Sequence, residues 1–199
     1  WGMIIAIVAA LVELGICDTF LSFCNQDYES SFSFSFFLYI FLGIALVEEI
    51  MKYLVVRQTV LKNSELDEPV DLMLYMIIAG LGFAALENIL LLVPTLGFGK
   101  VAALSFFRFI GATFLHALAS GTLGYFLALS IYQTKKRTRL IVLGIAIATL
   151  LHGLYNFAII KTTDNQDFIY IPIILLTALA FLVTSGFKKL KKIKSVCKI

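Results

Sequence analysis

Apolar stretches long enough to cross a lipid bilayer make up most of this chain. Of its 199 residues, 60% are hydrophobic and only 15% are charged, and the mean hydropathy is +0.96. A soluble domain of this size could not bury so much apolar surface, so the bilayer must be its solvent. Because lipid offers the backbone no hydrogen-bond partners, these stretches are expected to be helical. The composition therefore predicts an all-α, polytopic membrane helix bundle.

The apolar stretches divide the chain into six predicted transmembrane helices joined by short connections. About twenty apolar residues span a bilayer as a helix. The longest polar stretch, about 57–71, is too short to fold alone, so the whole chain 1–199 is interpreted as one membrane domain. Its polar motifs lie within about 33–160, and a basic tail covers about 188–199. The six helices are expected at about 2–24, 33–59, 72–93, 101–132, 140–160 and 168–187.

Two basic clusters predict the orientation of the chain. One covers Lys135–Arg139 and the other Lys188–Lys194. Short segments rich in Lys and Arg stay in the cytoplasm, so both clusters, and with them the C-terminal tail, are expected on the cytoplasmic side. Phospholipid headgroups explain these charges better than a nucleic acid does. The lipid bilayer is thus an expected partner, and no nucleic-acid partner is expected.

The three cysteines do not suggest a disulfide framework. Cys17 and Cys24 lie two helical turns apart near one end of the first predicted helix, and Cys197 lies in the tail. This spacing matches no metal-binding or redox motif, so the cysteines are interpreted as ordinary apolar side chains.

Ionisable side chains inside the apolar stretches carry the main functional signal. Keeping such a group in a membrane costs a few kcal/mol or more, so it is a functional-site hypothesis by default. Residues three or four apart share one face of a helix, which groups several of these side chains in pairs and triplets. Glu13 is interpreted separately, as a packing or access-path residue. The predicted site residues are Glu48, Glu49, Lys52, Glu87, His116, His152 and Asn156.

The types of the predicted site residues exclude some reaction mechanisms but leave several open. The chain lacks the His-Glu-x-x-His motif of zinc proteases and the Glu-x-x-His motif of di-iron bundles. A Glu and a His that activate water fit best, with a second His and an Asn stabilising the oxyanion at an attacked carbonyl. A metal held by Glu and His side chains remains an alternative. So do a proton-linked transporter or channel that uses the same groups as a relay, and a catalytically silent membrane scaffold.

Four motifs, in order, resemble those of the PrsW family of membrane proteases. They are Glu48-Glu49-x-x-Lys52, then Phe83-x-x-x-Glu87, then His116, and finally His152-x-x-x-Asn156. This family belongs to a superfamily with the CAAX prenyl endopeptidases and bacteriocin-processing proteins. The resemblance implies a glutamic-type intramembrane peptidase of a prokaryotic cell membrane, with no metal and no cofactor.

The resemblance also implies roles and a substrate. Glu48 is the expected general base, and His116 or Glu87 is expected to help hold the water. His152 and Asn156 would form the oxyanion hole, while Glu49 and Lys52 would orient and tune the centre. The expected substrate is a membrane-anchored protein, since the family's substrates include an anti-sigma factor.

Overall fold

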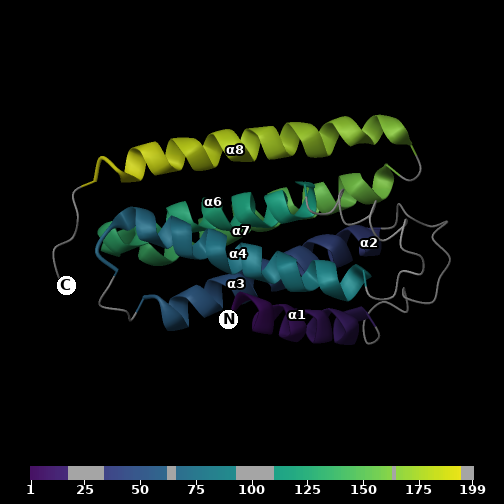
Figure 1. The fold of residues 1–199 in the computed structure, drawn as a ribbon, viewed down its shortest axis with the longest axis horizontal. Helices are drawn as coiled ribbons and strands as arrows, with labels where there is room; N and C mark the ends of the chain where they lie inside the picture. The colour runs from purple at the N-terminus through teal and green to yellow at the C-terminus, as the bar shows by residue number, and fades with distance from the viewer. Residues whose placement is uncertain (18–33, 62–65, 93–109, 163–164, 194–199) are drawn as a thin grey trace.

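The fold is an all-helical bundle, as the composition predicts (Figure 1). The computed structural model describes residues 1–17, 34–61, 66–92, 110–162 and 165–193, and every regular element within these ranges is a helix. In chain order they are α1 (Gly2–Ile16), α2 (Phe34–Leu38), the π-helix η4 (Tyr39–Ala45), α3 (Leu46–Thr59), α4 (Pro69–Leu92), α6 (Ala112–Tyr132), the short 3₁₀ turn η5 (Thr134–Lys136), α7 (Arg137–Lys161), the 3₁₀ turn η6 (Gln166–Ile169) and α8 (Tyr170–Leu190).

Five helical runs are long and apolar enough to cross a membrane. α2, η4 and α3 together form one of them, whereas α1 is shorter, with 15 residues. The prediction of six spans is therefore confirmed for five within the described residues. The end of the first predicted span and the start of the fourth lie outside those residues. The five runs are Phe34–Thr59, Pro69–Leu90, Ala112–Tyr132, Thr134–Lys161 and Asp167–Leu190.

α4 and α6 form the centre of the bundle and approach each other at small residues. A Cβ atom added to Gly80 would lie 2.6 Å from Ser120 Oγ and 2.7 Å from the carbonyl oxygen of His116. One added to Gly124 would lie 2.7 Å from Met73 Cα. Small residues allow such close backbone contact in membranes. The helices that carry Glu87 and His116 are therefore the central pair of the bundle.

The remaining helices surround this pair. α1 packs against α3 and α4, where Ala6 and Ala9 bury Phe83. α8 lies along the opposite edge of the bundle, against α6 and α7, and most of its surface faces outward (Figure 1). A larger apolar cluster joins α4 to α6, and its fully buried members include Met73, Met76, Leu115, Leu123 and Leu127.

The basic residues gather at one end of the bundle. Lys135 and Lys136 lie in the connection between α6 and α7, and Lys188 and Lys189 end α8, which runs back along α7 (Figure 1). All four side chains are exposed.

Cys17, directly after α1, departs from the sequence interpretation. It is disulfide-bonded, so it is not an ordinary apolar side chain as the spacing suggested.

We expect the variant Gly124→Ala to lower the stability of the bundle. The new methyl group would meet the Met73 backbone, which is held by the rest of α4 and cannot rotate away. Such overpacking costs about 1–3 kcal/mol. Thermal unfolding in detergent measures the loss, and Gly15→Ala serves as the control because nothing lies within 4 Å of its added Cβ. Equal midpoints for the two variants would contradict the close α4–α6 contact.

Candidate active site

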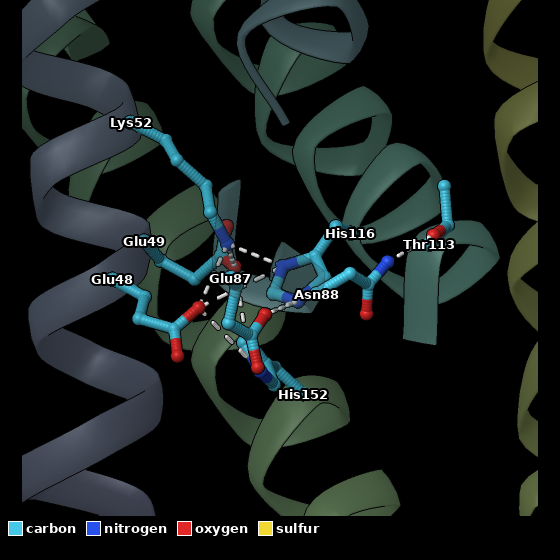
Figure 2. A network of polar contacts seen from close by, with 8 residues as sticks. All are labelled: Glu48, Glu49, Lys52, Glu87, Asn88, Thr113, His116 and His152. Atoms are coloured by element: carbon cyan, nitrogen blue, oxygen red, sulfur yellow. Dashed lines mark hydrogen bonds and ion pairs between the residues drawn. The ribbon is translucent and has the colours of Figure 1, made fainter. Parts of the chain in front are cut away.

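Three ionisable side chains of α3 meet inside the bundle (Figure 2). Their spacing places them on one helical face, because residues three or four apart are neighbours on a helix. Lys52 Nζ donates to Glu49 Oε1 at 2.8 Å and to Glu48 Oε2 at 3.3 Å. Lys52 and Glu49 are completely buried, and Glu48 is 4% exposed. Lys52 therefore pairs with both carboxylates of its own helix.

Lys52 also connects α3 to α6. Its ammonium lies 2.8 Å from His116 Nδ1 and 4.5 Å from the ring centroid of Phe83. An ammonium has three protons to donate and no lone pair. Its three protons are therefore directed to Glu48, Glu49 and His116, and the aromatic face of Phe83 adds a cation–π contact.

The contact with Lys52 sets the tautomer of His116. Because Lys52 can only donate, His116 Nδ1 must accept, and the ring proton of a neutral imidazole then lies on Nε2. Nε2 lies 2.7 Å from Glu87 Oε2, so that proton faces the Glu87 carboxylate. The Glu87 side chain is 27% exposed, which makes it much more open than the carboxylates of Glu48 and Glu49. His116 thus links the buried lysine to the open side of the site.

His152 brings α7 into the same network. Its Nδ1 lies 2.9 Å from Glu49 Oε1, so it donates a proton to that carboxylate. Its Nε2 is 3.9 Å from Glu48 Oε2. The rings of His116 and His152 meet edge to face, with centroids 5.0 Å apart. Both histidines therefore turn Nδ1 toward the lysine–carboxylate centre, where His116 Nδ1 accepts from Lys52 and His152 Nδ1 donates to Glu49.

Asn156 lies one turn after His152 on α7 and is half-buried. Among the described residues, its side-chain amide has no hydrogen bond. The structure thus brings six of the seven predicted site residues into one contact network and places the seventh beside it on the helix of His152. Within this part of the chain, the amide protons of Asn156 are available to a ligand.

Two features near the site were missed by sequence reasoning. Asn88 Nδ2 donates to Thr113 Oγ1 at 3.0 Å and so ties α4 to α6 beside Glu87 and His116 (Figure 2). The sequence gives only a weak indication of this contact: Asn88 directly follows Glu87, and Thr113 lies one turn before His116. Glu13 of α1, interpreted as a packing residue, lies within electrostatic range of Glu87 and Lys52.

Comparisons with known proteins agree with the motif resemblance. The family model described as PrsW family intramembrane metalloprotease matches residues 1–184. Protease PrsW of Oceanobacillus iheyensis is 32% identical over 171 residues, which cover 85% of this chain and 74% of that protein. Protease PrsW of Bacillus subtilis is 32% identical over 157 residues, covering 78% of this chain and 67% of its own. No solved structure matches.

The description of the family raises the question whether this site fits a metal. Glu48, His116 and His152 each offer one ligand atom, and these three atoms lie within 4.8 Å of one another. One carboxylate and two imidazoles form a known zinc ligand set. Here, however, the Lys52 ammonium already contacts Glu48 Oε2 at 3.3 Å and His116 Nδ1 at 2.8 Å. A divalent cation between these side chains would face a full positive charge at contact distance, so the arrangement does not fit a metal.

We expect Lys52 and Glu49 to be strongly coupled in stability. Lys52→Met leaves two carboxylates buried without their cation, and removing one partner of a buried ion pair costs about 3–5 kcal/mol. Adding Glu49→Gln to Lys52→Met should recover part of that loss, with a coupling of about 1–3 kcal/mol. Unfolding in detergent measures the cycle. Lys52→Met combined with Glu68→Gln, which changes an exposed residue, is the control and should be additive. Additivity in both cycles would contradict the buried pair.

Proposed function

Because this chain belongs to the PrsW family of intramembrane proteases, we propose that it is a glutamic-type endopeptidase that works without a metal. One observation carries the proposal: Glu48 Oε2 lies within 4 Å of Lys52 Nζ, His116 Nδ1 and His152 Nε2. A carboxylate at the meeting point of an ammonium and two imidazoles is suited to activate water. The lysine takes the place that a metal ion would need.

Glu48 is the general base in this proposal, and Glu49 is the orienting partner. Both contacts of Glu49 Oε1, to Lys52 and His152, are short, at 2.8 Å and 2.9 Å. The contacts of Glu48 are longer, between 3.3 Å and 3.9 Å, so Glu48 is held less tightly and can exchange partners. Glu48 takes a proton from water, and the hydroxide attacks the peptide carbonyl. The C–N bond then breaks as Glu48 returns the proton to the leaving amine.

Glu87 lies on the side of the contact network that is partly open. Both ring nitrogens of His116 are engaged, with Lys52 on one side and Glu87 on the other. His116 therefore positions its two neighbours. Glu87, whose side chain is 27% exposed although its Oε2 atom is buried, is the better candidate to hold the incoming water or the substrate backbone. Of the two candidates that the sequence offered for this role, the geometry favours Glu87.

His152 and Asn156 form the proposed oxyanion hole. His152 Nδ1 donates to Glu49, so Nε2 can donate to an oxyanion only when the ring carries a proton on both nitrogens. The Glu49 carboxylate is the counter-ion that would stabilise that imidazolium. The amide of Asn156, one turn away and half-buried, supplies the second donor. Donors placed where charge develops in the transition state are a large source of catalysis.

The site lies toward the outer end of the bundle in the orientation that we propose. Glu87 and His116 lie in the halves of α4 and α6 that are remote from the basic clusters. The positive charge of those clusters favours a cytoplasmic location for the other end, which carries the C-terminus of α8. The disulfide at Cys17 supports this orientation, since α1 runs along α4 toward the same outer end. The substrate class that follows is a membrane-anchored protein, such as an anti-sigma factor, cut near the outer surface.

We expect Glu48→Gln to abolish cleavage of a membrane-anchored anti-sigma factor by the purified protein in detergent. Loss of a general base lowers the rate by about 10²–10⁴-fold. Gel-based cleavage kinetics measure the loss, and Glu68→Gln, at an exposed carboxylate in the α3–α4 connection, should match wild type. The assay contains EDTA throughout. Activity that disappears in EDTA and returns with zinc would overturn the metal-independent mechanism.

We expect Asn156→Ala to lower kcat by about 10²–10³-fold, the loss typical of one oxyanion-hole donor. Asn156 does not titrate, so a proton relay would not need it. Cleavage kinetics and proton flux in liposomes are therefore measured on the same variant. Unchanged cleavage would remove Asn156 from the oxyanion hole, whereas a wild-type protein that cleaves nothing and carries a pH-driven proton flux would favour the transporter hypothesis instead.

A further inference from the structure

A π-helical segment lies immediately before the two catalytic carboxylates and packs against α7. η4 covers Tyr39–Ala45, and the N–H of Leu46 donates to the carbonyl of Phe41, five residues back. π-helical turns inside α-helices are rare and occur frequently at functional sites. η4 continues directly into α3, so any displacement of η4 is transmitted to Glu48 and Glu49.

The contact between η4 and α7 depends on Gly153. A Cβ atom at this position would lie 2.5 Å from Phe41 Cδ1, 2.7 Å from Cε1 and 2.9 Å from Cγ. Phe41 is buried, so its ring fills the space that a side chain at position 153 would occupy. Ordinary contacts between carbon atoms are about 3.5–4.0 Å. A larger residue at position 153 therefore has to displace the Phe41 ring, or the helix that carries it, by about 1 Å.

Aromatic contacts hold the Phe41 ring in this place. Phe37 stacks on Phe41 with centroids 4.2 Å apart and meets Phe157 of α7 edge to face at 6.3 Å. Gly153 and Phe157 directly follow His152 and Asn156 in the chain. Phe37 and Phe41 thus pack against Phe157 and Gly153. These two α7 residues are the immediate neighbours of the two proposed oxyanion donors.

We propose that Gly153 is a positioning residue that sets the distance between His152 and Glu49. The hydrogen bond from His152 Nδ1 to Glu49 Oε1 is 2.9 Å long and joins α7 to α3 close to the Phe41–Gly153 contact. Moving the helices apart by about 1 Å takes this pair beyond hydrogen-bonding distance. His152 then loses the carboxylate that orients it. The inference rests on the proposed function for its kinetic consequence, but the geometric part stands without it.

The kinetic test compares Gly153→Ala with a matched glycine on the same helix. Gly144 also lacks room for a side chain, since its Cβ would lie 2.7 Å from Phe126 Cβ, but it faces α6 away from the site. We expect Gly153→Ala to lower kcat about 100-fold with little change in KM, the effect of a displacement of about 1 Å. Gly144→Ala should lower the melting temperature and leave kcat within about twofold of wild type.

Rescue and coupling complete the test. Phe41→Ala removes all three ring atoms that clash, so Gly153→Ala combined with Phe41→Ala should recover at least about tenfold in kcat over Gly153→Ala alone. Independently of catalysis, a double-mutant cycle of Glu49→Gln and His152→Ala measures their coupling in unfolding experiments. We expect the cycle to show this coupling in the wild-type background. Repeated in the Gly153→Ala background, the same cycle should show none.

Two results would overturn the inference. One is a Glu49–His152 coupling that survives Gly153→Ala unchanged. The other is a loss of kcat that is equal for Gly153→Ala and Gly144→Ala, which would mark both glycines as packing residues. If wild type cleaves no substrate, the proposed function fails, while the coupling measurement still decides the role of Gly153.

Discussion

A buried ammonium group holds this site together. Lys52 has no exposed surface, and it satisfies its charge with two carboxylates of its own helix and an imidazole of α6. An isolated charge in a low-dielectric interior is very costly, so the Lys52 ammonium can stay buried only while its contacts with the carboxylates and the imidazole are made. Glu49 extends the network to α7 through His152, and His116 extends it to α4 through Glu87. Four helices are thereby tied to one cation.

The Lys52 ammonium also determines the charge and the proton positions at the site. A divalent metal would supply positive charge beside Glu48, and Lys52 supplies it as part of the chain. Because an ammonium only donates hydrogen bonds, it also assigns the ring proton of the neighbouring His116 imidazole to Nε2. The two histidine rings lie 5.0 Å apart, yet they are held in different orientations and are not interchangeable. Charge and proton placement at the site thus have one common source.

Much of this arrangement follows from sequence spacing, and some of it cannot. The helical fold follows from the length of the apolar stretches, and the shared face of Glu48, Glu49 and Lys52 follows from the helical repeat. The contacts between helices are different. That Lys52 reaches His116, and that Glu49 pairs with His152, depends on how α3 lies against α6 and α7, which the spacing along one helix does not give. Local sequence does not reveal the π-helix η4 either, because it reflects packing against α7 rather than propensity.

The glycine contacts also restrict how a polypeptide can reach the carboxylates. At Gly80 and Gly124 the backbones of α4 and α6 lie too close for even one added carbon atom, and Phe41 closes the space beside Gly153 in the same manner. An extended peptide is far wider than these gaps, so neither interface is a passage for it. Glu87, with 27% of its side chain exposed, marks the side on which the network is open. In the proposed function, a substrate that follows this side of the described network meets Glu87 before it reaches Glu48.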